Sequence, residues 1–394
     1  MKWLRDILNK VEPEFKNGGK LEKFAPIYEA TDTILFSTDE RTESGPHIRD
    51  SVDIKRVMIL VVLSLIPCYI FGAVNVGYQK ALTHGLDTSW LDNLITGLLS
   101  IGPIIAVTFI SGAFWELLFG VVRKHPISEG FLVTCALIPL TLPPSIPLWQ
   151  VAVATSFGIV IGKEIFGGVG MNIFNPALMA RAFLYFTYPA DISGDKVWAI
   201  SPDGYSGPTA LSIPAGKINA NAIDLLDKAS LELVFDFSWI NMFMGWIPGS
   251  IGETNKWLIL LGALFLIFIG ITSWRIMLGS VLGMTIMSLI TNFLAPFSTN
   301  AMLTIPPHYH LVMGSFMFGT VFMATEPVTA THTDKGRWIY GILIGMLTVI
   351  IRSINPAYPE GIMLAILLMN AFAPLIDYFI VQSNIKKRLL RYAQ

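Results

Sequence analysis

A short polar string near the middle of the chain, Asp203-Gly-Tyr-Ser206-Gly207-Pro-Thr209-Ala-Leu-Ser212, holds hydroxyl groups that could accept a covalent group. A threonine hydroxyl is a poor nucleophile without a base beside it. It can still accept a phosphoryl group when a second enzyme activates the donor, and small neighbouring residues would let that enzyme approach. The same Gly, Ser and Pro residues are typical of an ordinary turn. Thr209 is therefore a candidate modification site, with a plain turn as the alternative.

Two asparagines, Asn172 and Asn175, stand in the string GMNIFNPA between a glycine-rich stretch and an apolar run. Paired amides in an apolar pocket can hydrogen-bond the edge of a flat heterocycle such as an isoalloxazine ring. A helix break capped by Asn and Pro is the alternative interpretation.

Five acidic residues lie at or inside apolar stretches: Glu116, Glu129, Glu164, Glu326 and Asp377. Burying a carboxylate is costly, so carboxylates within a membrane are candidates for function. A sodium ion needs hard oxygen ligands, which carboxylates and the carbonyls of broken helices would supply. We expect Glu129, and Glu164 beside Lys163, to be solvated helix ends. Glu116 and Asp377 lie deeper in their apolar runs and are the stronger candidates for an ion path.

The composition places the chain in a membrane. Hydrophobic residues make up 53% and charged residues 14%, whereas a soluble domain carries roughly 25% charged residues. The net charge of −1 gives no indication of nucleic-acid binding. The two cysteines, Cys68 and Cys135, cannot alone hold an iron–sulfur cluster or a zinc ion. Any redox cofactor bound by this chain alone should be organic.

The apolar pattern predicts an all-α polytopic membrane protein of about ten transmembrane helices. The expected spans lie near 57–77, 98–121, 130–147, 148–162, 170–187, 257–274, 276–294, 309–324, 338–354 and 361–381. With the N-terminus in the cytoplasm, 20 of the 27 Lys and Arg residues fall on the inside, six fall on the outside, and Arg181 lies within a span. Because cytoplasmic segments carry the excess of Lys and Arg, both termini are expected in the cytoplasm.

The same pattern divides the chain into five parts. They are a cytoplasmic N-terminal arm (1–56), a first helix bundle (57–187), a periplasmic loop (188–256), a second helix bundle (257–382) and a cytoplasmic basic tail (383–394). The Thr209 string lies in the periplasmic loop.

An internal repeat relates the two bundles. Residues 149–163 (WQVAVATSFGIVIGK) parallel residues 338–352 (WIYGILIGMLTVIIR), and an Asn-Pro-Ala string follows each. In the expected topology the paired spans run in opposite directions, which predicts two inverted five-helix repeats with broken helices. A chance alignment of apolar sequence is the alternative.

Small and aromatic residues near the expected cytoplasmic face, with one acidic residue among them, could border a flat ring, because small residues leave room for a ring and aromatic ones flank it. They are Gly112, Ala113, Glu129, Gly130, Phe131, Phe24 and Tyr28. A small-residue helix contact and an interfacial aromatic belt would use the same residue types.

Several of these stretches resemble one family. The string around Thr209 is similar to the flavinylation motif Asp-x-x-Ser-Gly-Ala-Thr-x-x-Ser/Thr, with Pro208 in place of the usual alanine. The segments HIRDSVDIKRVMI, FWELLFGVVRKHPISEGF, KEIFGGVGMNIFNPALMARAFL, FMATEPVTA and INPAYPEGIMLAILLMNAFAPLID look like the B subunits of sodium-translocating NADH:quinone oxidoreductases. The resemblance covers essentially the whole chain. The related D subunits of Rnf-type ferredoxin:NAD oxidoreductases share the membrane core and the flavin motif, but they lack a polar arm like residues 1–50.

The resemblance implies a quinone-reducing subunit of a six-subunit sodium pump in the bacterial inner membrane, active only within that complex. Thr209, within the motif of Asp203, Ser206 and Gly207, would carry FMN through a phosphoester bond made by a flavin transferase. Electrons from NADH would reach this FMN through sister subunits. They would continue to a noncovalent riboflavin and then to ubiquinone or another quinone, while sodium leaves the cytoplasm.

The resemblance also assigns further residues. Asn172 and Asn175 would contact the riboflavin. The family's quinone-site region maps onto the seven residues named above, with Ala113 in place of a second glycine. The carboxylates that the family ties to sodium uptake correspond to Glu116, Glu326 and Asp377, with Glu326 in place of an aspartate. A secondary transporter of a small solute is the alternative from a different class, since inverted repeats and broken helices suit it equally well.

Overall fold

The computed structural model describes residues 2–15, 19, 21, 25, 28, 54–123, 130–202 and 205–392. Within these ranges the secondary structure is helical, apart from one isolated bridge between Ile218 and Asn300. The longer helices are α1 (Lys2–Phe15), α3 (Ile54–Thr83), α4 (Trp90–Arg123), α5 (Gly130–Leu140), α6 (Leu148–Val160), α7 (Pro176–Thr187), α9 (Ala222–Glu232), α11 (Lys256–Ile269), α12 (Trp274–Leu294), α15 (Asp334–Ile354) and α16 (Ile362–Tyr392). The shorter ones are η2 (Glu164–Phe166), α8 (Pro189–Ile192), α10 (Trp239–Met244), η3 (Ala295–Phe297), η4 (Ala301–Thr304), α13 (Pro307–Val312), α14 (Phe316–Phe318) and η5 (Gly319–Met323).

Six helices in the described part of the chain are long and apolar enough to cross a membrane. They span Arg56–Thr83, Trp90–Arg123, Leu148–Phe166, Trp274–Phe297, Asp334–Ile354 and Ile362–Arg391. A bilayer crossing needs about 20 residues of helix. The expectation of an all-helical polytopic membrane protein is therefore confirmed.

Four of the ten expected spans are short or broken helices. The helices α5, α7 and α11 have 11, 12 and 14 residues. The expected span 309–324 consists of α13, α14 and the π-helix η5, and Gly314 separates α13 from α14 with a φ of +64°. Pro143 and Pro144 follow shortly after the end of α5, where proline disfavours a further helical turn. Irregular backbone at this depth is tolerated where protein surrounds it.

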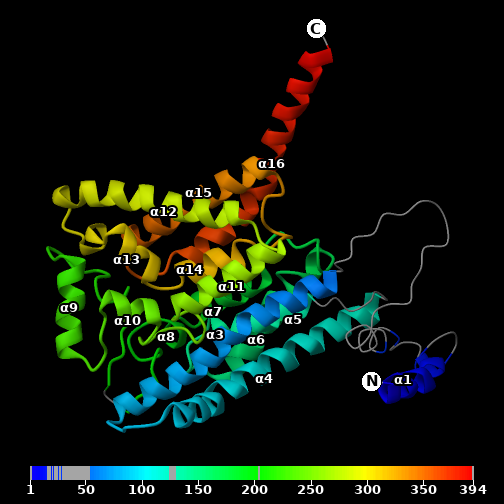
Figure 1. Ribbon diagram of the computed structural model, residues 1–394, viewed down its shortest axis with the longest axis horizontal. Helices are drawn as coiled ribbons and strands as arrows, with labels where there is room; N and C mark the ends of the chain where they lie inside the picture. Colours follow the sequence, from blue (N-terminus) through cyan, green and yellow to red (C-terminus); the bar gives the residue numbers. More distant parts are fainter. Residues whose placement is uncertain are drawn as a thin grey trace.

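Glycines let the long helices approach closely. The helices α12 and α15 lie side by side, as do α3 and α4 (Figure 1). A Cβ atom on Gly283 of α12 would collide with the carbonyl oxygen of Ile342, and one on Gly345 of α15 would collide with that of Ser280. Helices pack in membranes through such small residues, which stand four apart on both helices, as Gly279 with Gly283 and as Gly341 with Gly345.

The asparagines of the two Asn-Pro-Ala strings make the same local hydrogen bond. Oδ1 of Asn175 accepts a hydrogen bond from the Ala177 amide at 2.9 Å, and Oδ1 of Asn355 accepts one from the Ala357 amide at 3.1 Å. The first string begins α7, whereas α16 begins only at Ile362. Each group of helices, before and after the loop, thus contains a capped break at the corresponding place in its sequence.

Candidate functional site

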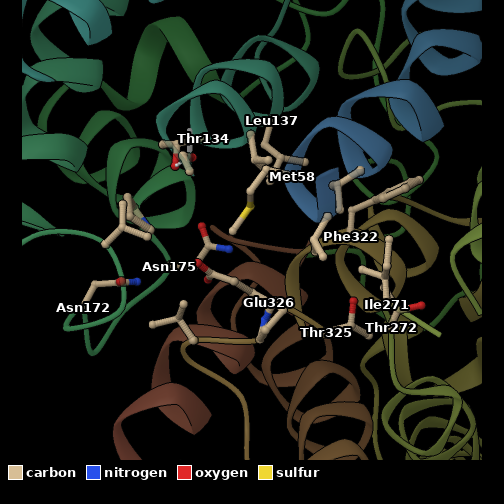
Figure 2. Close-up of a pocket in the computed structure, with 18 of the residues that line it drawn as sticks. Met58, Thr134, Leu137, Asn172, Asn175, Ile271, Thr272, Phe322, Thr325 and Glu326 are labelled. Carbon is tan, nitrogen blue, oxygen red and sulfur yellow. Dashed lines mark hydrogen bonds between the residues drawn. The ribbon is translucent and has the colours of Figure 1, made fainter. Parts of the chain in front are cut away.

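A cavity of about 750 Å³ lies among helices that come before and after the loop 188–256, which we call the first and the second group. We call this cavity the inner cavity (Figure 2). The first group supplies Asn172, Asn175 and residues of α3 and α5, whereas Phe322 and Glu326 come from the second group. Most of the lining is apolar. Figure 2 shows Asn172, Asn175 and Glu326 together at one side of the cavity, with Phe322 at another side.

The two asparagines are positioned by an irregular stretch before α7. Three glycines there, Gly167, Gly168 and Gly170, have φ values of +121°, +101° and +91°, which favour glycine. Asn175 is the N-cap of α7, and its Oδ1 accepts hydrogen bonds from the amides of residues 177 and 178. The interpretation as a capped helix break is therefore confirmed for Asn175. The cap uses only the amide oxygen, so the NH₂ group is left to face the cavity.

Glu326 receives hydrogen bonds from three sides. The Thr329 hydroxyl donates to its Oε2 at 2.9 Å, and the side-chain amides of Asn172 and Asn175 also hydrogen-bond with it. The carboxyl group is partly buried. The residues expected at a flavin and the carboxylate expected on a sodium path thus meet in one place, which the sequence did not indicate because about 150 residues separate them.

A buried charge network borders the same cavity. Lys163 lines the inner cavity and forms an ion pair with Glu116 and a second one with Glu164 at 3.2 Å. Arg123 reaches Glu164 at 3.4 Å and donates to its backbone carbonyl at 2.7 Å. Lys163, Glu116 and Glu164 are each at most 2% exposed. The expectation that Glu164 is a solvated helix end is wrong, because two cations hold it inside the protein. Glu129 lies outside the described residues.

The carboxylate of Asp377 lies elsewhere and stabilises a loop. It accepts hydrogen bonds from the His332 amide at 2.7 Å, the Thr333 amide at 3.1 Å and the Thr333 hydroxyl at 2.6 Å. Thr333 is in turn the N-cap of α15. Asp377 does not line the inner cavity, so the three acids expected on one sodium path are not gathered together in the structure.

The residues expected at a quinone are also spread out. Gly130 lines the inner cavity and Phe131 follows it on α5. Gly112 of α4 is buried against the Cys135 sulfur, and Ala113 beside it is partly exposed. Tyr28 is buried and donates to the carbonyl of Leu8 at 3.2 Å, within the N-terminal arm. Phe24 lies outside the described residues.

The Thr209 string forms a turn in the loop between the two helix groups. The amide of Ser212 donates to the Thr209 carbonyl at 3.0 Å, and its hydroxyl donates to the same oxygen at 2.9 Å. The Thr209 side chain is partly buried and Ser206 is exposed, whereas Gly207 is buried against Ala199. Asp203 lies outside the described residues. The expected turn is confirmed, and the Thr209 hydroxyl oxygen accepts a hydrogen bond from the Ser212 amide at 3.3 Å.

Aromatic rings pack beside the string. Tyr205 makes an edge contact with Phe235 at 5.9 Å between centroids. Burial raises the pKa of the Tyr205 phenol above its ordinary value. This phenol therefore stays protonated at neutral pH.

Thr209 borders two cavities, of about 400 and 370 Å³. The first is lined by Arg181 and Glu360, which form an ion pair at 2.5 Å. The second is lined by Glu253, Lys256 and Glu360. Sequence reasoning missed these charged residues. One available signal was Arg181 itself, because a charge within an apolar span is a functional candidate.

Comparisons with known proteins agree with this architecture. The family model described as "NQR2, RnfD, RnfE family" matches residues 41–386. The B subunit of the Na⁺-translocating NADH-quinone reductase of Chromohalobacter salexigens is 48% identical, covering 99% of this chain and 97% of its own. The corresponding proteins of Azotobacter vinelandii and of Pseudomonas aeruginosa strain LESB58 are 48% and 46% identical, each covering 98% of this chain and 99% of its own. The resemblance seen in the sequence is thus confirmed: the chain belongs to the NQR2, RnfD, RnfE family, among its Na⁺-translocating NADH-quinone reductase B subunits.

Proposed function

We propose that this chain is the flavin-carrying, quinone-reducing subunit of a respiratory sodium pump, and that Thr209 is its site of covalent FMN attachment. The observation that carries the proposal is the position of Thr209. Its hydroxyl belongs to a flavinylation motif, stands on a turn, and borders two cavities lined by buried charges.

The inner cavity fits a noncovalent flavin such as riboflavin. Ligand pockets commonly combine apolar walls with a few precisely placed polar groups. Here the walls are apolar, and the amides of Asn172 and Asn175 offer hydrogen bonds to the edge of a ring. Gly130 lines the same cavity, and its lack of a side chain would leave room there for a flat quinone ring.

Glu326 gives the inner cavity a negative charge that a sodium ion could balance. The two cations and two carboxylates of the adjacent network balance one another. Glu326 forms no ion pair with another described residue, and its neighbours Thr325 and Thr329 carry hydroxyl groups. Sodium favours such hard oxygen ligands. Glu116 and Asp377 would then act on sodium less directly, through charge and loop position.

The flavins, when bound, supply electron transfer, and the protein holds and insulates them. Electrons come from NADH through other subunits of the complex, because this chain has no nucleotide-binding fingerprint. Asn172 and Asn175 would orient the inner ring, and apolar residues such as Val133 and Phe322 would exclude water. Lys163, fixed by Glu116 and Glu164, places a positive charge beside the ring and would stabilise added electrons.

The proposed topology follows from the charge pattern and the repeat. The N-terminal arm (1–56) and the basic tail (383–394) would face the bacterial cytoplasm, and the loop carrying Thr209 (188–256) would face the periplasm. The bundles 57–187 and 257–382 would form two inverted repeats of five spanning or broken helices. This arrangement is supported by the matching Asn-Pro-Ala caps and by cavities lined from both groups, as expected at a repeat interface.

Replacing Thr209 with alanine tests the proposal. Thr209→Ala removes the hydroxyl at the acceptor position of the motif, so we expect loss of covalent FMN and of quinone reduction by the assembled complex. Ser193→Ala is the matched control, because Ser193 lines the same cavity but lies outside the motif. Thr209→Ser should retain part of the covalent flavin. Normal turnover in Thr209→Ala would contradict the proposal.

A further inference from the structure

Five buried charges lie together beneath Thr209, and we call them the outer charge cluster. They are Arg181, Glu253, Lys256, Arg352 and Glu360. All except Glu360 are at most 4% exposed, and the Glu360 side chain is 14% exposed. Three cations face two carboxylates, so the cluster carries one formal positive charge in excess. A buried charge is costly unless it is paired, so the excess calls for an anion.

Two of the three cations donate hydrogen bonds to backbone carbonyls of the protein. The Lys256 ammonium donates to the backbone carbonyls of Glu253 and Gly314 at 2.5 and 2.8 Å. The Arg352 guanidinium donates to the carbonyls of Glu360, His310 and Met313 at 3.0 Å each.

Arg181 differs from both. Its Nη2 donates to Glu360 at 2.5 Å, whereas its Nη1 is buried and has no hydrogen-bond partner among the described residues. Arg181 and Thr209 line the same cavity. The neighbouring cavity, which Thr209 also borders, is lined by Glu253, Lys256 and Glu360 of the same cluster. A buried, charged donor left unsatisfied is costly, so Nη1 of Arg181 calls for an acceptor from a ligand.

We propose that the outer charge cluster is an anion site that binds the phosphate group linking FMN to Thr209, with Nη1 of Arg181 as its donor. The inference rests on the proposed attachment of FMN at Thr209. A phosphodiester carries one negative charge, which equals the excess charge of the cluster. The planar guanidinium matches phosphate oxygens with paired donors. Arg181 is then a positioning residue, because it fixes the flavin through its phosphate.

The inner network provides the contrast. Arg123 and Lys163 face Glu116 and Glu164, so two cations meet two carboxylates and no charge is in excess. The inner network offers no comparable anion site among the described residues. The inner cavity beside it contains the carboxylate of Glu326 instead. The two cavities thus differ in the sign of the charge that they can accept.

The test uses the purified complex carrying Thr209→Val, which cannot form the covalent bond. Added FMN should bind to this complex, whereas riboflavin, the same ring without phosphate, should not bind at the vacant outer site. Adding Arg181→Gln should weaken FMN binding about tenfold or more, because a charged hydrogen bond is lost. Arg123→Gln is the matched control, since Arg123 also pairs with a glutamate but borders the inner network.

Arg181→Gln leaves Glu360 without its partner and could prevent folding. The double variant Arg181→Gln, Glu360→Gln removes both charges of the pair and should also lose FMN binding. Arg181→Lys should bind FMN with intermediate affinity, because it keeps the charge but loses the planar pair of donors. Equal FMN affinity in the Arg181→Gln or double variant and its parent, or equal binding of FMN and riboflavin to the parent, would overturn the proposal.

The experiments distinguish a failure of the anion site from a failure of the proposed covalent attachment at Thr209. If the unaltered complex carries no flavin on Thr209 and the Thr209→Val complex still binds FMN through Arg181, the covalent assignment fails and the anion site stands. If Thr209 carries FMN and the Arg181 variants bind free FMN normally, the anion site fails and the attachment stands.

Discussion

Individual charged residues are held in this protein by partners that lie far away in the sequence. Lys163 joins Glu116 of α4 to Glu164, and Arg181 of α7 meets Glu360 near the start of α16. The sequence identified Glu116 and Asp377 as the deeper candidates from their apolar surroundings, and the family resemblance added Glu326. It misplaced Glu164, because the position next to Lys163 resembles a solvated helix end. Which charges meet depends on packing between distant helices, which local patterns do not contain.

Lys163→Met should destabilise the protein by about 3–5 kcal/mol, because it leaves two buried carboxylates without their shared cation. We expect the assembled complex to lose this subunit at a clearly lower temperature. Lys228→Met is the control, since Lys228 pairs with Glu232 on the surface, and exposed pairs are worth about 0–1 kcal/mol. Equal melting of both variants would show that the buried network adds no stability.

Glu326→Gln should raise the sodium concentration needed for half-maximal turnover by at least tenfold. The carboxylate is the excess charge of the inner cavity, and two unit charges in contact near a protein surface interact by about 4 kcal/mol. The measurement is quinone reduction by the complex against sodium concentration. Asp334→Asn serves as control, because Asp334 is exposed and pairs with Arg275 and Arg337. An unchanged sodium dependence would remove Glu326 from the ion path.

Among the elements, α7 connects the two candidate flavin sites. Its N-cap Asn175 borders the inner cavity, and Arg181 borders the cavity at Thr209. Six residues of helix rise by about 9 Å, so one short helix fixes the relation between both sites. The sequence predicted the long helices well, because their apolar runs are unbroken. It predicted full spans at 130–147 and 309–324, where proline and the left-handed Gly314 break the helices.

Gly283→Ala should destabilise the α12–α15 pair by roughly 1–3 kcal/mol, the usual cost of overpacking. Its Cβ atom would collide with the Ile342 carbonyl, which belongs to the backbone and cannot turn away. Gly102→Ala is the matched control on α4, where a Cβ atom meets nothing within 4 Å. The measurement compares the yield and the thermal stability of the two purified variants. A Gly283→Ala protein as stable as the control would mean that the two helices separate easily.

For the whole molecule, the charge asymmetry predicts which regions face each side of the membrane. Both native cysteines are buried, so an introduced surface cysteine can be labelled selectively. A membrane-impermeant thiol reagent added to intact cells should label Leu231→Cys, on exposed α9, and should not label Leu389→Cys, on the exposed end of α16. Inverted membrane vesicles should give the opposite pattern. Labelling of Leu389→Cys in intact cells would reverse the proposed orientation.

The arrangement of the whole molecule links a periplasmic attachment site to a buried cavity between two groups of helices, and the attachment at Thr209 is the central claim. The most direct test is the mass of the peptide containing Thr209, taken from the complex purified from a host that has the flavin transferase. We predict a mass gain equal to FMN minus one water, located on Thr209 by fragmentation and absent from Thr209→Ala. An unmodified Thr209 in the active complex would contradict the account.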